Sequence, residues 1–220
     1  TGDMSFEIAH QIGAKGHILG IDFSPEAITA NQDRLSGTQH NNIKFQTGNA
    51  ETFQTQTPFD ITYSRFMIDH LKQPDKAIQA MVNATQKGGK IVIEDVDVSE
   101  MTASVNYPAL NKLKTLLIQL VQNNGGNATR GTQLTSLVQQ AHGISHPLTY
   151  THSHQPKGST GAIKRVPLNI LNSISDKLLE NHMLTPPELK NLQQDLEQLA
   201  KDTSITVSFP KIYQVIAEKN

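Results

Sequence analysis

Apolar runs alternate with amphipathic segments through the first half of the chain. Four runs have the length and the Ile, Val and Phe content of buried strands, and three segments carry apolar residues at helical spacing. The predicted strands are 17–22, 43–46, 59–63 and 90–98, and the predicted helices are 4–14, 25–35 and 74–86, the last stopping at Gly88-Gly89. This alternation predicts an α/β fold with a doubly wound, Rossmann-like and mostly parallel sheet, covered by helices on both faces.

The second half of the chain has a different pattern, in which helices dominate. Leu, Ile and Val recur at helical spacing over 106–123 and 131–141. Residues 168–201 have the pattern of two amphipathic helices, broken at Thr185-Pro186-Pro187. Two further strands are predicted, at 147–153 and 212–217.

A chain of 220 residues suits one α/β domain with insertions. We expect the Rossmann-like core over 1–100 and a helical lid or substrate segment over 101–142. The remaining residues, 143–220, are expected to add C-terminal strands and a second helical insertion to the same domain.

Composition and charge narrow the classes of function. Nineteen basic and 20 acidic residues give a formal net charge of -1, which offers no electrostatic reason for a nucleic-acid partner. The absence of cysteine excludes disulfides and thiol catalysis. No apolar run approaches the ~20 residues of a membrane span, so no span is expected and the cytoplasm is the default location. Four histidines lack compact ligand spacing, so no metal site is predicted: His142, His146, His152 and His154.

The beginning of the chain carries the strongest chemical signal. Thr1-Gly2-Asp3 has the composition of the end of a glycine-rich nucleotide loop, and a helix and a strand ending in Asp22 follow it. In doubly wound folds such a turn lets backbone amides approach the ligand, and the acid accepts hydrogen bonds from two ribose hydroxyls. We therefore expect a further strand, ending in a Gly-x-Gly turn, to precede Thr1 in the natural protein.

Five segments in order resemble the motifs of class I S-adenosylmethionine-dependent methyltransferases. They are Thr1-Gly2-Asp3, Ile18 to Glu26, Gly48-Asn49-Ala50-Glu51, Phe59 to Phe66 and Lys87-Gly88-Gly89-Lys90. In the second half, Glu94 to Asp97, Gly131 to Gly143 and Leu184 to Leu189 resemble a bacterial small-molecule branch that is similar to quinone-biosynthesis methyltransferases. The chain departs from the family pattern at Asn49, where an Asp is usual.

The resemblance implies S-adenosylmethionine as the cofactor and assigns residues to it. Asp22 would bind the ribose, Phe23 would lie against adenine, and Asn49 and Glu51 would border the adenine amino group. Arg65 would contact the methionine carboxylate, although a structural ion pair is an equal alternative. The full set expected at the cofactor is Thr1, Gly2, Asp3, Asp22, Phe23, Asn49, Ala50, Glu51, Ser64 and Arg65.

The implied reaction is an in-line displacement at a methyl carbon, which needs alignment, a dry pocket and, for a protonated nucleophile, a base. His70 is the candidate base, with a structural histidine as the alternative. Glu94, Asp95 and Asp97 end a strand, and one of them could face the substrate. The helical insertions are rich in Leu and Ile, which predicts a small, partly apolar acceptor. Part of the row Leu113, Leu116, Leu117 and Leu120 is expected to face this cleft.

Two other functions remain open at this point. A nicotinamide-dependent oxidoreductase also binds ribose with an acid that ends the second strand. A non-catalytic cofactor-binding module of the same fold is the third alternative. The sequence does not decide whether the protein is a monomer or a homodimer.

Overall fold

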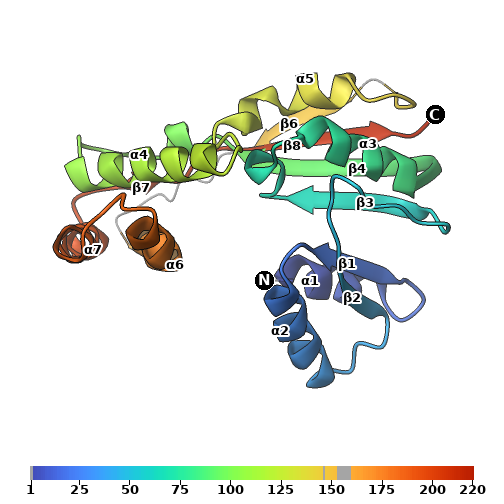
Figure 1. Ribbon diagram of the computed structural model, residues 1–220, viewed down its shortest axis with the longest axis horizontal. Coiled ribbons are helices and arrows are strands. Elements are labelled where there is room, and N and C mark those ends of the chain that lie inside the picture. Colours follow the sequence, from blue (N-terminus) through green and yellow to red (C-terminus); the bar gives the residue numbers. More distant parts are fainter. Residues whose placement is uncertain (1, 146, 153–159) are drawn as a thin grey trace.

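The computed structural model describes residues 2–145, 147–152 and 160–220. Thr1, His146 and His154, named above, lie outside these residues, and so does the side chain of His152. Figure 1 shows a small unit at the N-terminal end, a larger sheet beside it, and a group of helices beyond the end of that sheet. No described helix is long and apolar enough to cross a membrane.

The N-terminal unit is a parallel pair of strands with two helices. β1 (Ile18–Asp22) pairs with β2 (Ile43–Thr47), and α1 (Asp3–Ile12) and α2 (Pro25–Ser36) pack on them. Ser24 is the N-cap of α2, and Pro25 occupies its first turn, as such a sequence predicts. The core of this unit is small and consists of Phe6, Ala9, Ile28, Ile43 and Phe45.

The larger sheet has the strand order β3-β4-β8-β6. β3 and β4 are parallel, and β8 is antiparallel to both of its neighbours, so three of the four strands run in one direction. The bounds are Phe59–Arg65 for β3, Thr85–Val96 for β4, Leu148–His152 for β6 and Ile212–Glu218 for β8. The expected α/β fold with a mostly parallel sheet is confirmed.

Helices cover one face of this sheet. The 3-10 helix η1 (Ile68–His70), α3 (Pro74–Ala84), η3 (Arg130–Gln133) and α5 (Leu134–Gln139) lie on that face. The buried residues there are Ile68, Ala77, Ile78, Val82, Ile91, Ile93, Leu134, Val138, Val215 and Ala217. The opposite face is open at Ile61, Leu148 and Tyr150, which are exposed. In the described part, β1 and β3 each pair with one strand only, and no ladder joins the two sheets.

The expected helix stop at Gly88-Gly89 is wrong. α3 ends at Ala84, and β4 already begins at Thr85, so both glycines lie within the strand. Gly88 has a φ of 76°, and a Cβ on Gly89 would lie 2.7 Å from the carbonyl oxygen of Asp60 on β3. The glycines therefore accommodate an irregularity in the β3–β4 ladder, where the register shifts after Phe59.

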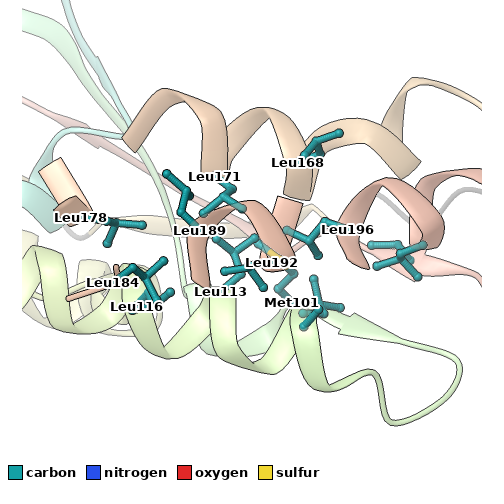
Figure 2. Packing of buried hydrophobic residues seen from close by; sticks show 14 of the residues in the cluster. Met101, Leu113, Leu116, Leu168, Leu171, Leu178, Leu184, Leu189, Leu192 and Leu196 are labelled. Atoms are coloured by element: carbon teal, nitrogen blue, oxygen red, sulfur yellow. The ribbon is translucent and has the colours of Figure 1, made fainter. Parts of the chain in front are cut away.

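The group of helices beyond the sheet has a core of its own. α4 (Pro108–Asn123), α6 (Val166–Glu180) and α7 (Pro186–Lys201) pack against one another, and Figure 2 shows their leucines meeting. The short strands β5 (Thr102–Ala103) and β7 (Val207–Ser208) pair antiparallel, and β7 and Met101 contribute to this core. Thr185 and Glu188 form a capping box at the start of α7.

The segment 101–142, expected to act as one lid, is divided between two cores. Its first helix, α4, joins α6 and α7. Its last helix, α5, packs on the sheet with η3. The proposed boundaries of the three regions stay a prediction, but the packing groups α4 with α6 and α7.

Candidate functional site

Asp22 ends β1 at the carboxyl edge of the parallel pair, the edge at which open α/β sheets bind ligands. Its Oδ1 accepts the N–H of Ser24 at 2.9 Å, and its carbonyl accepts the N–H of Gly48 at 2.9 Å. The turn fixes the carboxylate and leaves it exposed. Phe23, the next residue, is 77% exposed. An exposed carboxylate beside an exposed aromatic ring suits a ribose diol with an attached planar base.

The loop after β2 contains the other residues expected near adenine. Oδ1 of Asn49 accepts the N–H of Glu51 at 2.8 Å, and Oε1 of Glu51 accepts the N–H of Gln73 at 2.9 Å. Asn49 therefore shapes the loop as an Asx turn, and Glu51 ties it to the start of α3. Ala50 is half-buried against the sheet. The loop lies beside Asp22, and its contact with adenine stays a prediction.

The start of α1 is explained by helix packing. Gly2 has a φ of 70°, and a Cβ there would lie 2.3 Å from Oδ1 of Asn31 in α2. Only glycine combines this backbone with so close an approach. Asp3 forms an ion pair with Arg34, which joins α1 to α2. The role of Gly2 and Asp3 at a cofactor stays a prediction.

Arg65 is the last residue of β3 and faces the first turn of α1. Its Nη1 is 3.6 Å from Oε2 of Glu94, the register partner on β4. Its guanidinium carbon is 4.7 Å from the centre of the Phe66 ring, and its Nη1 is 3.7 Å from Sδ of Met4. The side chain is one-third exposed. Arg65 is therefore an oriented cation between the end of β3 and the first turn of α1.

Glu94 accepts hydrogen bonds from the strands on both of its sides. Its Oε2 accepts the hydroxyl of Tyr63 on β3 at 2.7 Å, and its Oε1 accepts Nε2 of Gln214 on β8 at 2.5 Å. Burial, and then the hydrogen bond to Glu94, raise the pKa of Tyr63 to about 12, so the phenol stays a donor at neutral pH. Only 12% of the Glu94 side chain is exposed.

The residues on either side of Arg65 behave differently. Ser64 is buried, and its Oγ has no hydrogen-bond partner among the described residues, so it is closed to a ligand in this structure. Phe66 has a φ of 52°, which is a strained conformation for a bulky side chain. Its N–H still donates to the Glu94 carbonyl at 2.9 Å, so the ladder continues up to the point where the backbone turns.

Two buried acids lie beneath the turn that carries His70. Oδ2 of Asp95 accepts the N–H of Asp69 at 2.9 Å, and Oδ1 of Asp95 accepts the N–H of Val96 at 2.9 Å. Burial, and then the neighbouring Asp69, raise the pKa of Asp95 to about 7. Burial also raises the pKa of Asp69 to about 6. The raised pKa values mean that the pair of acids retains protons at pH values where exposed carboxyl groups are ionised.

His70 points outward from this turn. Its Nε2 is 3.6 Å from Oδ1 of Asp69, and its side chain is 60% exposed. Partial burial lowers its pKa, so the imidazole is neutral at neutral pH. A neutral, accessible imidazole beside a carboxyl group has the chemistry of a general base. Catalysis by His70 stays a prediction.

The three acids expected at the substrate are not equivalent. Asp95 is fully buried, and both of its oxygens accept backbone N–H groups. Oδ1 of Asp97 accepts the N–H and the hydroxyl of Ser99 at 2.9 and 2.5 Å, at the start of the 3-10 helix η2 (Val98–Glu100). Glu94 interacts with Arg65. Their contact with a substrate stays a prediction.

The leucines expected to face the cleft are also placed. Leu113, Leu116 and Leu120 are buried among α4, α6 and α7, so the expectation is wrong for these three. Leu117 is partly buried against the same core. The reason is that α6 and α7 pack on the apolar stripe of α4 and leave no leucine row free for a ligand.

Two described cavities are lined by neither Asp22 nor Arg65. One of about 320 Å³ is at the amino ends of β1 and β2, between His10, His17 and His40. The other, of about 220 Å³, lies between residues 51–54 and α3. Within the described residues, no group of three or more His, Asp or Glu could hold a metal ion.

Sequence reasoning missed several residues of the site. Tyr63 lies two residues before Arg65 on one strand, so alternation places both on one face, and that signal was available. Gln214 comes from the far end of the chain, and only the β4–β8 register brings it to Glu94. Neither the burial of Asp69 nor the backbone of Phe66 has a sequence signal.

Sequence comparison finds similar proteins among quinone-biosynthesis methyltransferases. The demethylmenaquinone methyltransferase of Shouchella clausii is 26% identical over 93 residues, which are 42% of this chain and 40% of that protein. The ubiquinone/menaquinone biosynthesis C-methyltransferase UbiE of Geobacter sp. is 33% identical over 95 residues, with the same coverage of 42% and 40%. The matches thus span about two fifths of the length of these relatives.

Solved structures show the same fold at low identity. Phosphoethanolamine N-methyltransferase 2 of Haemonchus contortus, in complex with phosphomonomethylethanolamine and S-adenosylhomocysteine, has a TM-score of 0.58 at 17% identity. The alignment covers 99% of this chain and 47% of that one. The [4+2]-cyclase SpnF has a TM-score of 0.54 at 14% identity, covering 99% of this chain and 71% of that one. A family described as a methyltransferase domain matches residues 1–142, which is more than half of the sequence. The chain therefore belongs to the methyltransferase-domain family.

Proposed function

We propose that the protein is an S-adenosylmethionine-dependent methyltransferase that acts on a small, partly apolar molecule. The observation that carries the proposal is the exposed carboxylate of Asp22. The carboxylate is oriented by the N–H of Ser24 and is followed by the exposed ring of Phe23, and the main-chain carbonyl of Asp22 joins the loop after β2 through Gly48. A ribose and a base would meet their expected partners at this edge of the sheet. The methyltransferase family match and the S-adenosylhomocysteine in a structural relative support this ligand.

The chain would contribute alignment and a proton acceptor to the reaction. S-adenosylmethionine supplies the activated methyl group. Asp22 would hold the ribose, and Arg65 would hold the carboxylate of the amino-acid part, so that the acceptor approaches from the ends of β3 and β4. His70 lies just beyond β3 and would take a proton from a hydroxyl or ammonium acceptor, with Asp69 beside it.

Titration calorimetry with S-adenosylmethionine, S-adenosylhomocysteine and NAD tests the proposal. We expect both sulfur-containing ligands to bind, and we expect no measurable heat of binding with NAD. Binding of NAD alone would favour the nicotinamide-dependent oxidoreductase instead. Binding of both sulfur ligands without turnover on any acceptor would favour a non-catalytic module of the same fold.

The acceptor class is tested separately. Methyl-labelled S-adenosylmethionine incubated with bacterial metabolite extracts should transfer label to a small molecule and none to added RNA or DNA. A cytoplasmic location agrees with these ligands, and sedimentation would distinguish a monomer from a homodimer. Label appearing in nucleic acid would contradict the proposed acceptor class.

A further inference from the structure

We infer that Glu94 is a positioning residue, which with Tyr63 and Gln214 holds the guanidinium of Arg65 in place for the carboxylate of the methyl donor. The inference rests on the proposed function and refines it. Glu94 is removed from the expected substrate contacts and assigned to the cofactor side.

The first support is the arrangement of one row across three strands. Arg65 pairs with Glu94 in the β3–β4 register, and Glu94 pairs with Gln214 in the β4–β8 register. Tyr63 lies on the same face of β3 as Arg65, two residues earlier. The carboxylate thus receives one hydrogen bond from each neighbouring strand, at 2.7 and 2.5 Å, and the cation lies 3.6 Å away.

The second support is the orientation of the cation. The Phe66 ring covers one side of the guanidinium at 4.7 Å, and Glu94 occupies one edge. Nη1 also reaches Met4 at 3.7 Å, in the first turn of α1. Guanidinium has five donors in a fixed fork, so donors remain for a ligand carboxylate when one edge is taken. A one-third exposed side chain with these contacts is aimed at the turn where the chain enters α1.

Two opposite effects of Glu94 on an anionic ligand must be compared. The negative charge of Glu94 repels a ligand carboxylate. Its ion pair with Arg65, however, already restricts the arginine side chain, so that less conformational entropy is lost when a ligand binds. Two donors already stabilise the Glu94 charge, and the group is 12% exposed, so it is a fixed part of the sheet. We therefore expect positioning to exceed repulsion.

The test uses two ligands that differ in the amino-acid part. S-adenosylhomocysteine has the carboxylate, and 5′-methylthioadenosine lacks it while keeping the base, the ribose and the sulfur. In calorimetry of the full chain, Arg65→Ala should weaken S-adenosylhomocysteine by roughly tenfold or more, the cost of a charge-assisted hydrogen bond. Glu94→Gln and Tyr63→Phe should weaken it by about three- to tenfold. All three variants should bind methylthioadenosine like the parent.

A matched control exists in the same sheet. Lys90 and Glu218 form another cross-strand ion pair between register partners, on β4 and β8. Glu218→Gln should change neither affinity, and thermal unfolding should show that all variants are folded. Equal weakening of both ligands by Glu94→Gln, or tighter S-adenosylhomocysteine binding, would overturn the inference. A parent protein that binds neither ligand would instead contradict the proposed function.

Discussion

The helical core and the sheet bury apolar surface with different residues. Twelve of the sixteen buried residues among α4, α6 and α7 are leucines. In the cluster against the main sheet, seven of the ten buried residues are Ile or Val, and four of these seven come from the covering helices rather than from the strands. The difference therefore follows the surface that is covered: the leucines pack helix on helix, and the branched residues pack helices on a sheet. β4 also carries Glu94 and Asp95 near its carboxyl end, and Asp69 lies on the neighbouring η1. The comparison separates a helical core that buries apolar surface from the strand ends at which we propose the chemistry.

The largest expected effect tests the helical side of this comparison. Leu113→Ala removes a side chain with no exposed surface from the centre of the α4–α6–α7 core. It should lower the free energy of unfolding by about 2–5 kcal/mol, measured in urea. Leu117→Ala, at a partly buried position of the same helix, should cost clearly less. Loss of S-adenosylhomocysteine binding in folded Leu113→Ala protein would show that the helical core also determines ligand binding, against the proposed division between the two regions.

The next effect concerns the sheet side. Asp22→Ala should weaken S-adenosylhomocysteine binding by roughly 1–3 kcal/mol, because ribose hydroxyls would lose their acceptor. Stability should change little, because the carboxylate is exposed at the sheet edge. Asp33→Ala, at an exposed position on α2, is the control and should leave affinity unchanged. Unchanged affinity in folded Asp22→Ala protein would contradict the ribose role.

The buried acids predict a pH dependence of stability. Burial raises the pKa of Asp69 to about 6 and that of Asp95 to about 7, above the ~4 of an unfolded chain. Between these limits the native state binds more protons, so stability falls as the pH rises from about 4 to about 7, and levels off above that. The slope is at most ~1.4 kcal/mol per pH unit for each proton. His70 acts in the opposite sense, because its lowered pKa removes stability as the pH falls through about 6.5.

Asp69→Asn separates these two contributions. Subtracting its urea-derived stability from that of the parent across pH 4.5–8 cancels most of the His70 effect. The difference should decrease with rising pH. A difference that stays flat, or increases, would show that the carboxyl pair does not hold an extra proton in the folded protein.

The local elements were predictable wherever sequence signals agree. Ser24-Pro25 and Thr185-Pro186 mark helix starts by capping and by proline, and both begin helices in the structure. The predicted helix end at Gly88-Gly89 was wrong because both glycines lie at an irregularity within β4. That irregularity depends on the close approach of Asp60 on β3, which the local sequence does not show.

The site was predictable only in part, because tertiary pairing decides it. Asp22 and Arg65 follow from their positions at strand ends. The division of 101–142 between two cores depends on which neighbour buries each helix, and spacing alone does not specify that neighbour. The Glu94–Gln214 contact depends on a strand register more than a hundred residues away in sequence.

The smallest expected change in stability concerns two residues with a positive φ, His182 in the helical region and Phe66 at the end of β3. His182 has a φ of 54° just after α6, where its N–H and that of Met183 donate to the carbonyls of Leu179 and Leu178. This is a helix-ending pattern in which glycine is preferred, so His182→Gly should stabilise the protein by up to ~1 kcal/mol.

Phe66, with a φ of 52°, has no helix end to explain it. Phe66→Gly should relieve similar strain but lose the ring over Arg65, so its net change in stability should be below ~1 kcal/mol. The difference should appear in binding. Phe66→Gly should reduce the preference for S-adenosylhomocysteine over methylthioadenosine, and His182→Gly should not. If both variants kept the same ligand preference, the backbone strain and the ring of Phe66 would have no effect on ligand binding, like the strain at His182.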